Sequence, residues 1–471
     1  MNPSSSTSPY PTRRTILRSA AVVGVAGTSL AGCVTGGGEA DPGKKGDTSA
    51  TNPLGVPADA PLEVVIFKGG YGDDYAKAAG SLYTQKYPKA VIDHKGIQRV
   101  GDVLQPRFVA DTPPDVVDNS GAGRLDLATL VASKKLKDLT ELLDSPSIDD
   151  PAKTVRQTLL PGVVEDGTFD GSVQVLNFSS VLWGVWYSKS LFAKNGWTFP
   201  TTWEEMLTLG DTIKKTGVAP WTWQGKYPEY MNDPLQSLAA KAGGMDLVKA
   251  IDNLEPGAWQ SAPMLAAAEA IHQLVVRGHI MTGSEALSHT EAQNAWCKGQ
   301  AAFIPCGSWL EGEQQAVTPA GFDMVMAAVP ALTGSDKLAN GAVQGASSES
   351  FLVPAKAKNP QGGLEYLRLL FSKQVARGFA ESAKALPVVV GATDGLTLSS
   401  GLASVAEAAK TAGPNVFTYR FRTWYAPLSK AFDDATGELL TNRVNPAQWA
   451  ERIQKAADAV AKDSSIAKHK R

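Results

Sequence analysis

The sequence has few cysteines and histidines, the residues that most often build disulfide frameworks and metal sites. Its 471 residues include three cysteines and five histidines, and neither a CxxC pair nor a Cys/His cluster occurs. So few cysteines exclude a disulfide scaffold, and the spacing gives no sign of structural zinc. We therefore expect no metal and no other cofactor.

The sequence also lacks an excess of charge of one sign. Lys and Arg number 45 and Asp and Glu number 47, which gives a formal net charge of −2 and a pI of about 6.3. Nucleic-acid binders usually have a basic patch and a high pI, so no nucleic-acid partner is expected. A hydrophobic content of 43% excludes global disorder. At about 150 residues per domain, the length predicts two or three domains.

Long apolar runs are rare. The only one without a charge, residues 20–31, is shorter than the roughly 20 residues that span a bilayer. It follows Arg13 and Arg14, an order typical of a bacterial export signal of the twin-arginine type. Residues 30–33, LAGC, resemble the lipobox of bacterial lipoproteins. We therefore predict that residues 1–32 are a signal peptide and that Cys33 carries a lipid.

Residues 33–60 are rich in Gly, Ser, Thr, Pro, Asp and Lys and show no periodic apolar face. This composition predicts a flexible tether between the lipid and a globular body. Removal of the signal peptide would leave 42 basic and 47 acidic residues, a net charge of −5. The prediction is thus a protein held by its lipid on the extracellular face of the cell membrane.

The two remaining cysteines, Cys297 and Cys306, are expected to stay unpaired. The strand predicted at 301–305 carries the chain away from Cys297 at about 3.3 Å per residue. The Cα atoms would then lie farther apart than the limit of about 7 Å for a disulfide bond.

The body starts with alternating strands and helices. Short β-prone runs at 62–67, 90–94 and 114–117 are separated by helical patterns at 74–87 and 103–110. Because parallel neighbours need a crossover between them, this order predicts a parallel α/β sheet.

A long β-prone run at 173–188 separates this first α/β set from a second one. We therefore predict a two-lobed α/β fold with a hinge, in which each lobe is built from separate parts of the chain. The predicted bounds are 61–177 plus 343–375 for the first lobe and 178–342 plus 376–471 for the second. A ligand would bind at strand ends in a cleft between the lobes.

No catalytic signature is complete. Residues 345–349, GASSE, fail the GxSxG pattern at its last position, and neither GxxxxGK[ST] nor HExxH occurs. Adjacent acids such as Glu204 and Glu205 point apart on a helix and would not flank a glycosidic bond. We predict that the protein is not an enzyme, and an anchored glycan hydrolase stays open as the alternative.

Tryptophan is unevenly distributed. None of the 11 precedes Trp183, and six fall between Trp183 and Trp223. A sugar ring has a C–H face and a hydroxyl rim, so it binds flat aromatic surfaces flanked by polar side chains. Trp183 and Trp186 lie on opposite sides of one strand, so one of them is core and the sequence does not decide which. The aromatic candidates are Trp183, Trp221, Trp223, Tyr230, Trp309 and Trp424.

Polar residues recur at the ends of the predicted strands. Gly, Asn, Asp and Ser also favour plain turns, but their recurrence at one edge of the sheet favours a binding site. The polar candidates are Gly70, Tyr71, Asn119, Ser120, Ser308, Ser347 and Glu349.

Several motifs resemble those of extracellular solute-binding proteins of carbohydrate ATP-binding cassette importers. They are VWYSKSLF at 185–192, PTTWEEM at 200–206 and the segment 296–309. Segments 112–121, 250–256 and 351–356 are similar to actinobacterial binding lipoproteins for N-acetylglucosamine and N,N′-diacetylchitobiose. The resemblance covers essentially the whole mature chain. It implies a monomeric Venus-flytrap protein that closes on a sugar and delivers it to a membrane permease.

By this resemblance Trp309 and Trp424 stack on sugar in the second lobe, with Tyr230 as a third platform. The loop 68–71 and the Asn119-Ser120 turn would supply hydrogen bonds from the first lobe. Two departures lie near the expected cleft: residues 177–183 lack the tyrosine run of these relatives, and Cys306 replaces a polar amide. The expected ligand is therefore N-acetylglucosamine or a chito-oligosaccharide, with another oligosaccharide or amino sugar as the alternative.

Overall fold

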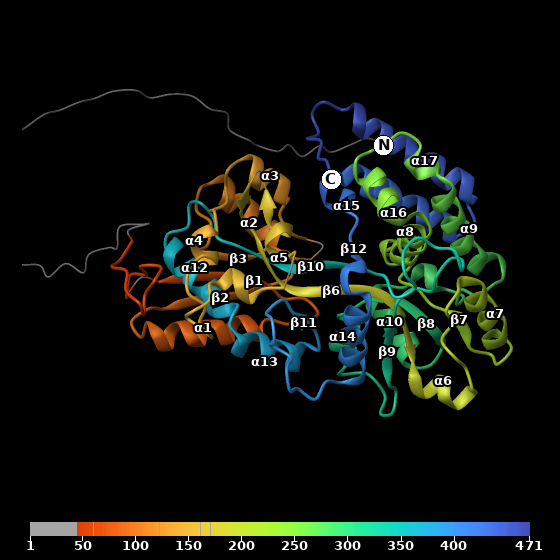
Figure 1. The fold of residues 1–471 in the computed structure, drawn as a ribbon, viewed down its shortest axis with the longest axis horizontal. Coiled ribbons are helices and arrows are strands. Elements are labelled where there is room, and N and C mark those ends of the chain that lie inside the picture. The colour runs from red at the N-terminus through yellow and green to blue at the C-terminus, as the bar shows by residue number, and fades with distance from the viewer. Residues whose placement is uncertain (1–44, 60, 122, 161, 170) are drawn as a thin grey trace, which may run out of the picture. The chain divides into compact units, whose positions relative to one another are not determined.

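The protein was analysed as a computed structural model that describes residues 45–59, 61–121, 123–160, 162–169 and 171–471. The predicted signal peptide, Cys33 and residues 34–44 of the predicted tether lie outside the described residues. Strands and helices alternate along the chain, which confirms the α/β class (Figure 1).

The strands form one large mixed sheet and one small hairpin. Along the main path of the large sheet the order is β2-β1-β3-β10-β6-β8-β7, and β9, β11 and β12 pair with its central strands. β1 is parallel to β2 and β3, whereas β10 is antiparallel to both β3 and β6. The bounds are β1 Leu62–Phe67, β2 Ile92–Ile97, β3 Val116–Asp118, β4 Thr168–Phe169, β5 Ser172–Val173, β6 Leu176–Ser188, β7 Ala219–Trp221, β8 Ala301–Gly307, β9 Met324–Ala327, β10 Val343–Leu352, β11 Leu386–Pro387 and β12 Val416–Phe417.

Helices cover the sheet in two groups. Figure 1 shows α1, α12 and α13 beside β1 to β3, and α8, α9, α16 and α17 at the opposite end of the sheet. The α-helices are α1 Asp74–Lys86, α2 Val100–Val109, α3 Leu127–Ala132, α4 Thr140–Leu143, α5 Val163–Asp166, α6 Lys189–Asn195, α7 Trp203–Lys214, α8 Glu229–Asp252, α9 Ala262–Val276, α10 His289–Cys297, α11 Leu310–Gln314, α12 Pro360–Leu370, α13 Lys373–Ala383, α14 Ser400–Ala412, α15 Phe421–Trp424, α16 Ala426–Leu440 and α17 Pro446–Lys462.

The sequence explains where these helices begin. Thr202, the residue before α7, accepts a hydrogen bond from the backbone N–H of Glu205, whose carboxylate accepts one from the backbone N–H of Thr202 in return. This capping box satisfies two N–H groups that a helix otherwise leaves unpaired. Asn445 and Gln448 repeat the arrangement at the start of α17.

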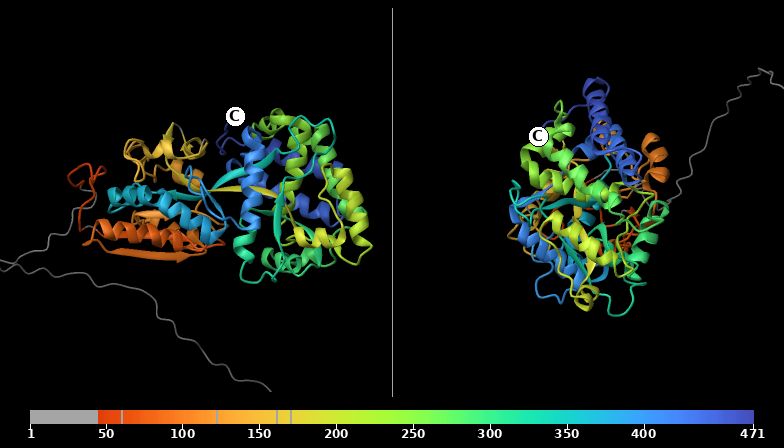
Figure 2. Two further views of the ribbon diagram at one scale, coloured as in Figure 1. Left: turned by 60° about the horizontal axis from the view of Figure 1, so that its bottom comes forward. Right: turned by 90° about the vertical axis from the view of Figure 1, so that its right-hand side faces the viewer.

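Two long strands, β6 and β10, join the two lobes. They pair antiparallel from Gln344 opposite Trp183 to Phe351 opposite Leu176. At one end β10 also pairs with β3, and at the other end β6 also pairs with β8. Figures 1 and 2 show β6, in yellow, passing from one group of elements into the other. The predicted long crossing strand is therefore present, with a second strand beside it.

The hydrophobic core of the first lobe extends farther along the chain than predicted. Its main cluster takes residues between Leu54 and Phe178 and again between Phe351 and Ala392. Phe379 of α13 is fully buried there, with its ring centroid 5.1 Å from that of Phe178. The predicted bound at residue 375 is therefore wrong, because the apolar face of α13 packs onto the first lobe.

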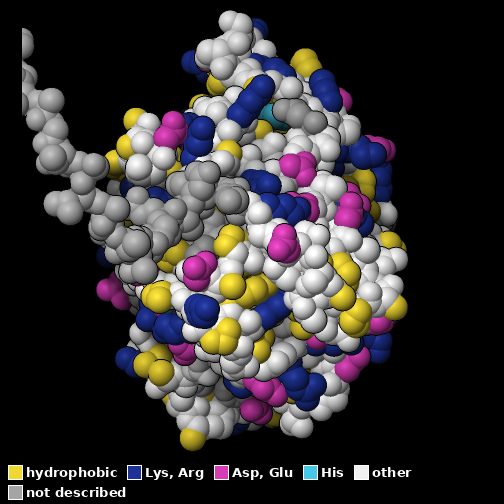
Figure 3. Space-filling view, turned by 90° about the vertical axis from the view of Figure 1, so that its left-hand side faces the viewer, with side chains coloured by type: hydrophobic (Ala, Val, Ile, Leu, Met, Phe, Trp, Pro, Cys, Tyr) yellow, Lys and Arg dark blue, Asp and Glu magenta, His cyan; other side chains and the backbone are white. Residues whose placement is uncertain are grey.

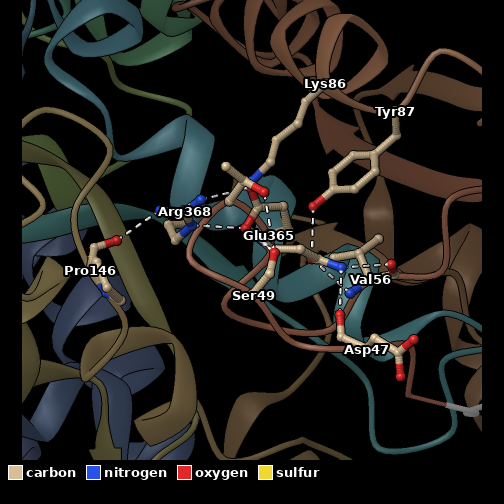
Figure 4. Close-up of polar contacts among 10 residues, drawn as sticks. Asp47, Ser49, Val56, Lys86, Tyr87, Pro146, Glu365 and Arg368 are labelled. Carbon is tan, nitrogen blue, oxygen red and sulfur yellow. Dashed lines mark hydrogen bonds and ion pairs between the residues drawn. The ribbon is translucent and has the colours of Figure 1, made fainter.

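The second part of the predicted tether is also folded. Leu54 and Val56 are 1% and 3% exposed in the core of the first lobe. Asn52 holds this segment: its side-chain oxygen accepts from the Val56 N–H at 2.9 Å and from the Tyr87 hydroxyl at 3.0 Å. Figure 4 shows Tyr87 pointing toward the segment. Residues 45–59 are thus part of the first lobe, contrary to the predicted flexible tether at 33–60.

A buried ion cluster lies beside this segment (Figure 4). The Glu365 carboxylate of α12 is fully buried and accepts from Lys86 at 2.6 Å and from Arg368 at 2.8 Å. Arg368 also donates to the Pro146 carbonyl oxygen at 2.8 Å. A buried charge is tolerated only when it is paired in this way, so the cluster joins α1, α12 and the 144–148 loop.

The described residues also settle three smaller points. Cys297 and Cys306 are both free and buried, as predicted. Within the described ranges, no helix has the length and apolar character needed to cross a bilayer. Figure 3 shows basic and acidic side chains mixed over the face that lies at the left of Figure 1, where they gather into no patch of one sign.

We predict that Leu54→Ala destabilises the protein by about 2 to 5 kcal/mol, because it removes a fully buried side chain. Urea unfolding of the purified body measures the loss. Val276→Ala, at a position 60% exposed in α9, is the control and should change the free energy of unfolding by less than about 0.5 kcal/mol. Equal stability of Leu54→Ala and the wild type would show that residues 45–59 are not packed.

Candidate functional site

Three aromatic side chains meet where β6 and β8 enter the second lobe. The ring centroid of Trp309 lies 6.0 Å from that of Trp183 and 6.2 Å from that of Tyr230, with both pairs edge to face. All three residues are half-buried. They come from β6, the start of α8 and the turn before α11, so the fold brings together side chains far apart in sequence. We call Trp183, Tyr230 and Trp309 the aromatic cluster.

Gly307 makes room for this cluster. It pairs with Trp183 across the β6–β8 ladder, and a Cβ atom on it would lie 1.9 Å from the Trp309 ring. The missing side chain therefore allows the Trp309 indole to fold back over the end of β8.

The choice between Trp183 and Trp186 is also resolved. Trp186 is fully buried in the core and donates from its indole nitrogen to the Cys306 carbonyl oxygen at 3.1 Å. Trp183 lies on the other face of β6, where it contacts Trp309. Trp186 is therefore core, and Trp183 remains a candidate.

Two aromatic candidates belong to the core instead. Trp221 is fully buried with its ring centroid 5.2 Å from that of Phe303, and Trp223 is 2% exposed. Both side chains lie in the main cluster of the second lobe. The prediction of Trp221 and Trp223 as ligand platforms is wrong, because both indoles are buried in this core.

Trp424 packs on aromatic rings other than those of the aromatic cluster. It is the last residue of the short helix α15, and its ring is half-buried. The Trp424 ring centroid lies 5.1 Å from that of His469 and 6.1 Å from that of Tyr425. Its role in binding therefore stays a prediction from the family resemblance.

Buried polar side chains on β10 and α8 lie next to the aromatic cluster. We call Gln344, Asp233 and Gln236 the polar wall. Gln344 stands opposite Trp183 in the β6–β10 ladder and donates to Asp233 at 3.1 Å. Burial raises the pKa of the Asp233 carboxyl to about 8, although the nearby Arg422 guanidinium acts in the opposite direction. Gln236 lies one turn further along α8, 3.5 Å from the Gln344 amide nitrogen.

The sequence analysis missed Asp233, Gln236, Gln344 and Arg422. A usable signal existed in α8, where residues 232–236, NDPLQ, place polar side chains at positions that an amphipathic helix would bury. No such pattern marks Arg422, which lies in the short helix α15. Its Nη2 donates to Asp433 at 3.2 Å.

The first lobe contributes Tyr71 and Gly70. The Tyr71 ring packs on Phe379 at 5.2 Å between centroids, and its hydroxyl is buried near Ser179 and Ser308. Burial raises the pKa of Tyr71 well above its usual range, and the negative charge of Glu349 raises it further. Gly70 lies across from Glu313 of α11, whose Oε1 would be 3.7 Å from a Cβ atom on the glycine. Residues of both lobes therefore reach this region.

Three of the predicted hydrogen-bonding side chains are already engaged with the protein. The amide of Asn119 exchanges hydrogen bonds with the backbone of Leu125 at 2.8 and 3.1 Å. Ser120 donates to Asp118 at 2.6 Å, and Ser308 accepts from the Leu182 N–H at 3.3 Å. These contacts shape the loops of the site, and direct binding of a ligand by the three side chains stays a prediction.

Ser347 and Glu349 of β10 have different surroundings. Ser347 donates to Asp166 of α5 at 2.9 Å, and Asp166 also accepts from Arg420 of the second lobe at 3.2 Å. Glu349 is 5% exposed and accepts from the Tyr75 hydroxyl at 3.3 Å. Both side chains are thus engaged within the protein, and their contact with a ligand stays a prediction.

Several buried polar atoms near the aromatic cluster lack a hydrogen-bond partner among the described residues. Buried polar groups are normally paired, so such a concentration marks a place where another molecule supplies the partners. The unpaired atoms include donors and acceptors, and the hydroxyl groups of a ligand pair with both, because a hydroxyl both donates and accepts. The atoms are Tyr71 Oη, Ser179 Oγ, Gln236 Nε2, Gln344 Oε1 and Arg422 Nη1. Flat aromatic rings beside these atoms fit a polyhydroxylated ring.

A hollow of about 390 Å³ lies elsewhere on the second lobe. It is lined by Met281, Leu287 and Gln300 among others and includes none of the aromatic cluster or the polar wall. Its lining offers no aromatic platform, so we do not place the site there.

Comparison with known proteins identifies the family. Residues 104–408 match the sequence profile of the family described as bacterial extracellular solute-binding protein. The chain is 33% identical over 466 residues to the diacetylchitobiose binding protein NgcE of Streptomyces coelicolor, a match that covers 97% of this chain and 98% of that protein. The chain therefore belongs to the bacterial extracellular solute-binding proteins.

Solved structures agree on the fold. A complex of the solute-binding protein RafE with raffinose superposes with a TM-score of 0.67 at 17% identity, covering 85% of this chain and 99% of that one. A chitin oligosaccharide binding protein gives a TM-score of 0.66 at 18% identity, with coverage of 82% and 93%. These neighbours confirm the predicted two-lobed architecture.

We predict that Tyr71→Phe keeps or raises the melting temperature of the ligand-free protein, because it removes a buried hydroxyl without a partner. Tyr75→Phe is the matched control. Its hydroxyl donates to Asp118 at 3.0 Å, so its loss should cost about 1 to 3 kcal/mol. Thermal unfolding measures both, and a comparable loss in Tyr71→Phe would show that the Tyr71 hydroxyl is paired.

Proposed function

We propose that this protein is the sugar-binding component of an ABC importer and that it captures N-acetylglucosamine oligosaccharides, N,N′-diacetylchitobiose above all, between its two lobes. It then delivers them as a monomer to the permease subunits in the membrane. The observation that carries the proposal is the aromatic cluster flanked by unpartnered buried polar atoms.

The geometry supports a sugar ligand in two ways. The half-buried Trp183 and Trp309 offer apolar surface to the C–H face of a pyranose ring. Gln344 on the shared strand β10, Arg422 in the second lobe and Tyr71 in the first offer donors and acceptors to its hydroxyl and amide groups. Because both lobes contribute, a ligand that touches both favours the closed form.

The choice of chitobiose rests on the similarity to the diacetylchitobiose binding protein NgcE, which runs along almost the whole chain. Raffinose, the ligand of the RafE complex, is the kind of alternative that the same fold can hold. The polar wall is compatible with either, so the experiment must compare sugars.

Binding without hydrolysis is the proposed activity. A glycosidase needs two carboxyl groups on either side of the scissile bond. Asp118 and Glu349, which meet in the first lobe, are 0% and 5% exposed and lie against the Tyr75 hydroxyl, and Asp233 of the polar wall is buried against Gln344. They cannot flank a sugar in this arrangement.

We predict that Trp309→Ala weakens binding of diacetylchitobiose about tenfold in calorimetry, since stacking and burial of one ring are lost together. Trp197→Ala, which removes another half-buried indole of the second lobe, should leave the affinity unchanged. Trp424→Ala tests the platform suggested by resemblance, and a similar loss would add Trp424 to the site.

Two outcomes would contradict the proposal. Unchanged affinity in Trp309→Ala would remove the aromatic cluster from the site. Steady release of N-acetylglucosamine from chito-oligosaccharides by the purified wild type would replace binding with hydrolysis.

We also propose that Cys33 carries the lipid anchor. In a bacterium that processes lipoproteins, the wild-type chain should take up radiolabelled palmitate and stay with the membrane fraction. Cys33→Ser should lose the label and appear in the medium or the soluble fraction. A labelled Cys33→Ser protein would place the lipid elsewhere.

A further inference from the structure

Two carboxyl groups converge on one hydroxyl in the interior of the first lobe. The Tyr75 hydroxyl of α1 lies 3.0 Å from Oδ2 of Asp118 at the end of β3 and 3.3 Å from Oε2 of Glu349 on β10. Both carboxyl side chains are buried. A phenol O–H has one proton to donate, so the Tyr75 oxygen satisfies both contacts fully only if one carboxyl group is protonated and donates to it.

Within the described part of the chain, no basic side chain neutralises this pair. Among the described residues, no Lys, Arg or His side chain forms an ion pair with Asp118 or Glu349. The titratable groups that face the pair are phenols: Tyr75 of α1, Tyr71 of the loop before it and Tyr366 of α12. The Ser120 hydroxyl donates to Asp118 at 2.6 Å. Burial raises the pKa of Glu349 well above its usual range, and the charge of Asp118 raises it further.

The backbone of Glu349 is strained. Its φ is 56°, in the left-handed region that side chains other than glycine rarely adopt. Such a conformation costs on the order of 1 to 3 kcal/mol and persists only when its surroundings fix it. The ladder partners on either side, Ser348 with Ser179 and Ser350 with Asn177, keep one register, so the strain is confined to one residue.

We propose that Asp118 and Glu349 share a single proton at neutral pH and that this proton holds β10 in the shape on which ligand binding depends. The shared proton fixes the Glu349 side chain beside Asp118 and thereby supports its left-handed backbone. Loss of the proton puts two negative charges together in an apolar interior, which the phenols cannot neutralise.

The pair connects to the site through adjacent residues. Ser120, which binds Asp118, also accepts from the Ser350 N–H at 2.8 Å, and the Asn119 N–H donates to the Ser350 carbonyl oxygen at 2.8 Å. The negative charge of Glu349 also raises the pKa of the buried Tyr71 hydroxyl. Ionisation of the pair therefore disturbs the crossing strand and the first-lobe side of the site together. This second step rests on the proposed sugar binding, whereas the shared proton does not.

The sign of the pH effect follows from proton linkage. The folded state keeps a proton on Glu349 that the unfolded chain releases near pH 4.3. Stability from this group is therefore complete below that pH and declines as the pH rises toward the folded-state pKa. Glu349→Gln keeps a donor in place of the acidic proton but cannot ionise, so it escapes this decline.

The first test measures the melting temperature of the sugar-free protein from pH 5 to pH 8. Glu349→Gln should gain about 3 °C or more relative to the wild type over this range. Glu381→Gln, which changes an exposed carboxylate of α13, should run parallel to the wild type. If the melting temperatures of Glu349→Gln and the wild type changed in parallel with pH, the proposal of a shared proton would be wrong.

A second measurement covers the case in which Glu349→Gln fails to fold. Burial raises the pKa of the Asp233 carboxyl to about 8, so this group is first removed by Asp233→Asn. Infrared difference spectra of Asp233→Asn should show the C=O stretch of a protonated carboxylic acid at pH 7 that is lost on alkaline titration. Absence of the band at pH 7 in this variant would overturn the proposal.

The link to binding is tested with diacetylchitobiose in the wild type and in Glu349→Gln, both of which keep Asp233 of the polar wall. Between pH 7 and pH 9 the affinity of the wild type should fall at least about threefold more than that of Glu349→Gln. An equal fall with and without Glu349→Gln would overturn the link to the site. If no sugar binds at any pH, the proposed function fails, while the melting temperatures still decide the shared proton.

Discussion

The antiparallel pairing of β6 with β10 is the interaction on which the other features of this structure depend. Both strands belong to both lobes, because β10 pairs with β3 at one end and β6 pairs with β8 at the other. The backbone ladder of β6 and β10 therefore links the first lobe to the second. The register of this one ladder sets Trp183 opposite Gln344 and thus the aromatic cluster beside the polar wall.

In this arrangement the two lobes contribute different kinds of side chain to the site. The second lobe provides rings and amides on β6, α8 and β10, and the first lobe provides Tyr71 beyond β1 and the buried acids of β3 and β10. Unpaired polar atoms in the interior reduce the stability of the fold. The strained backbone of Glu349 reduces it further. Proteins keep such features mainly where a ligand recovers the loss, which is why we assign the function to this site rather than to the exposed hollow near Leu287.

The sequence predicted the parts of the fold that follow from local pattern. Alternating β-prone and helical runs gave the α/β class and the crossing strand, and the spacing around Cys297 and Cys306 predicted their unpaired state. The predicted lobe boundary was wrong because the apolar face of α13 has the same periodicity whichever lobe it packs on. Only the contact between Phe379 and Phe178 shows that α13 belongs to the first lobe. Residues 45–59 read as a tether because their packing rests on two apolar side chains, Leu54 and Val56, in an otherwise polar segment.

The site was predictable only in part for similar reasons. Trp309 and Trp183 were found by residue type, but type alone also selected Trp221 and Trp223, which the fold buries. Asp233 and Gln344 meet through the pairing of distant segments, which no local pattern reveals. The most direct test is a crystal structure of the protein with diacetylchitobiose. The account predicts a pyranose ring stacked on Trp309, with its rim within hydrogen-bond distance of Gln344 and Tyr71, and a sugar bound away from these residues would contradict it.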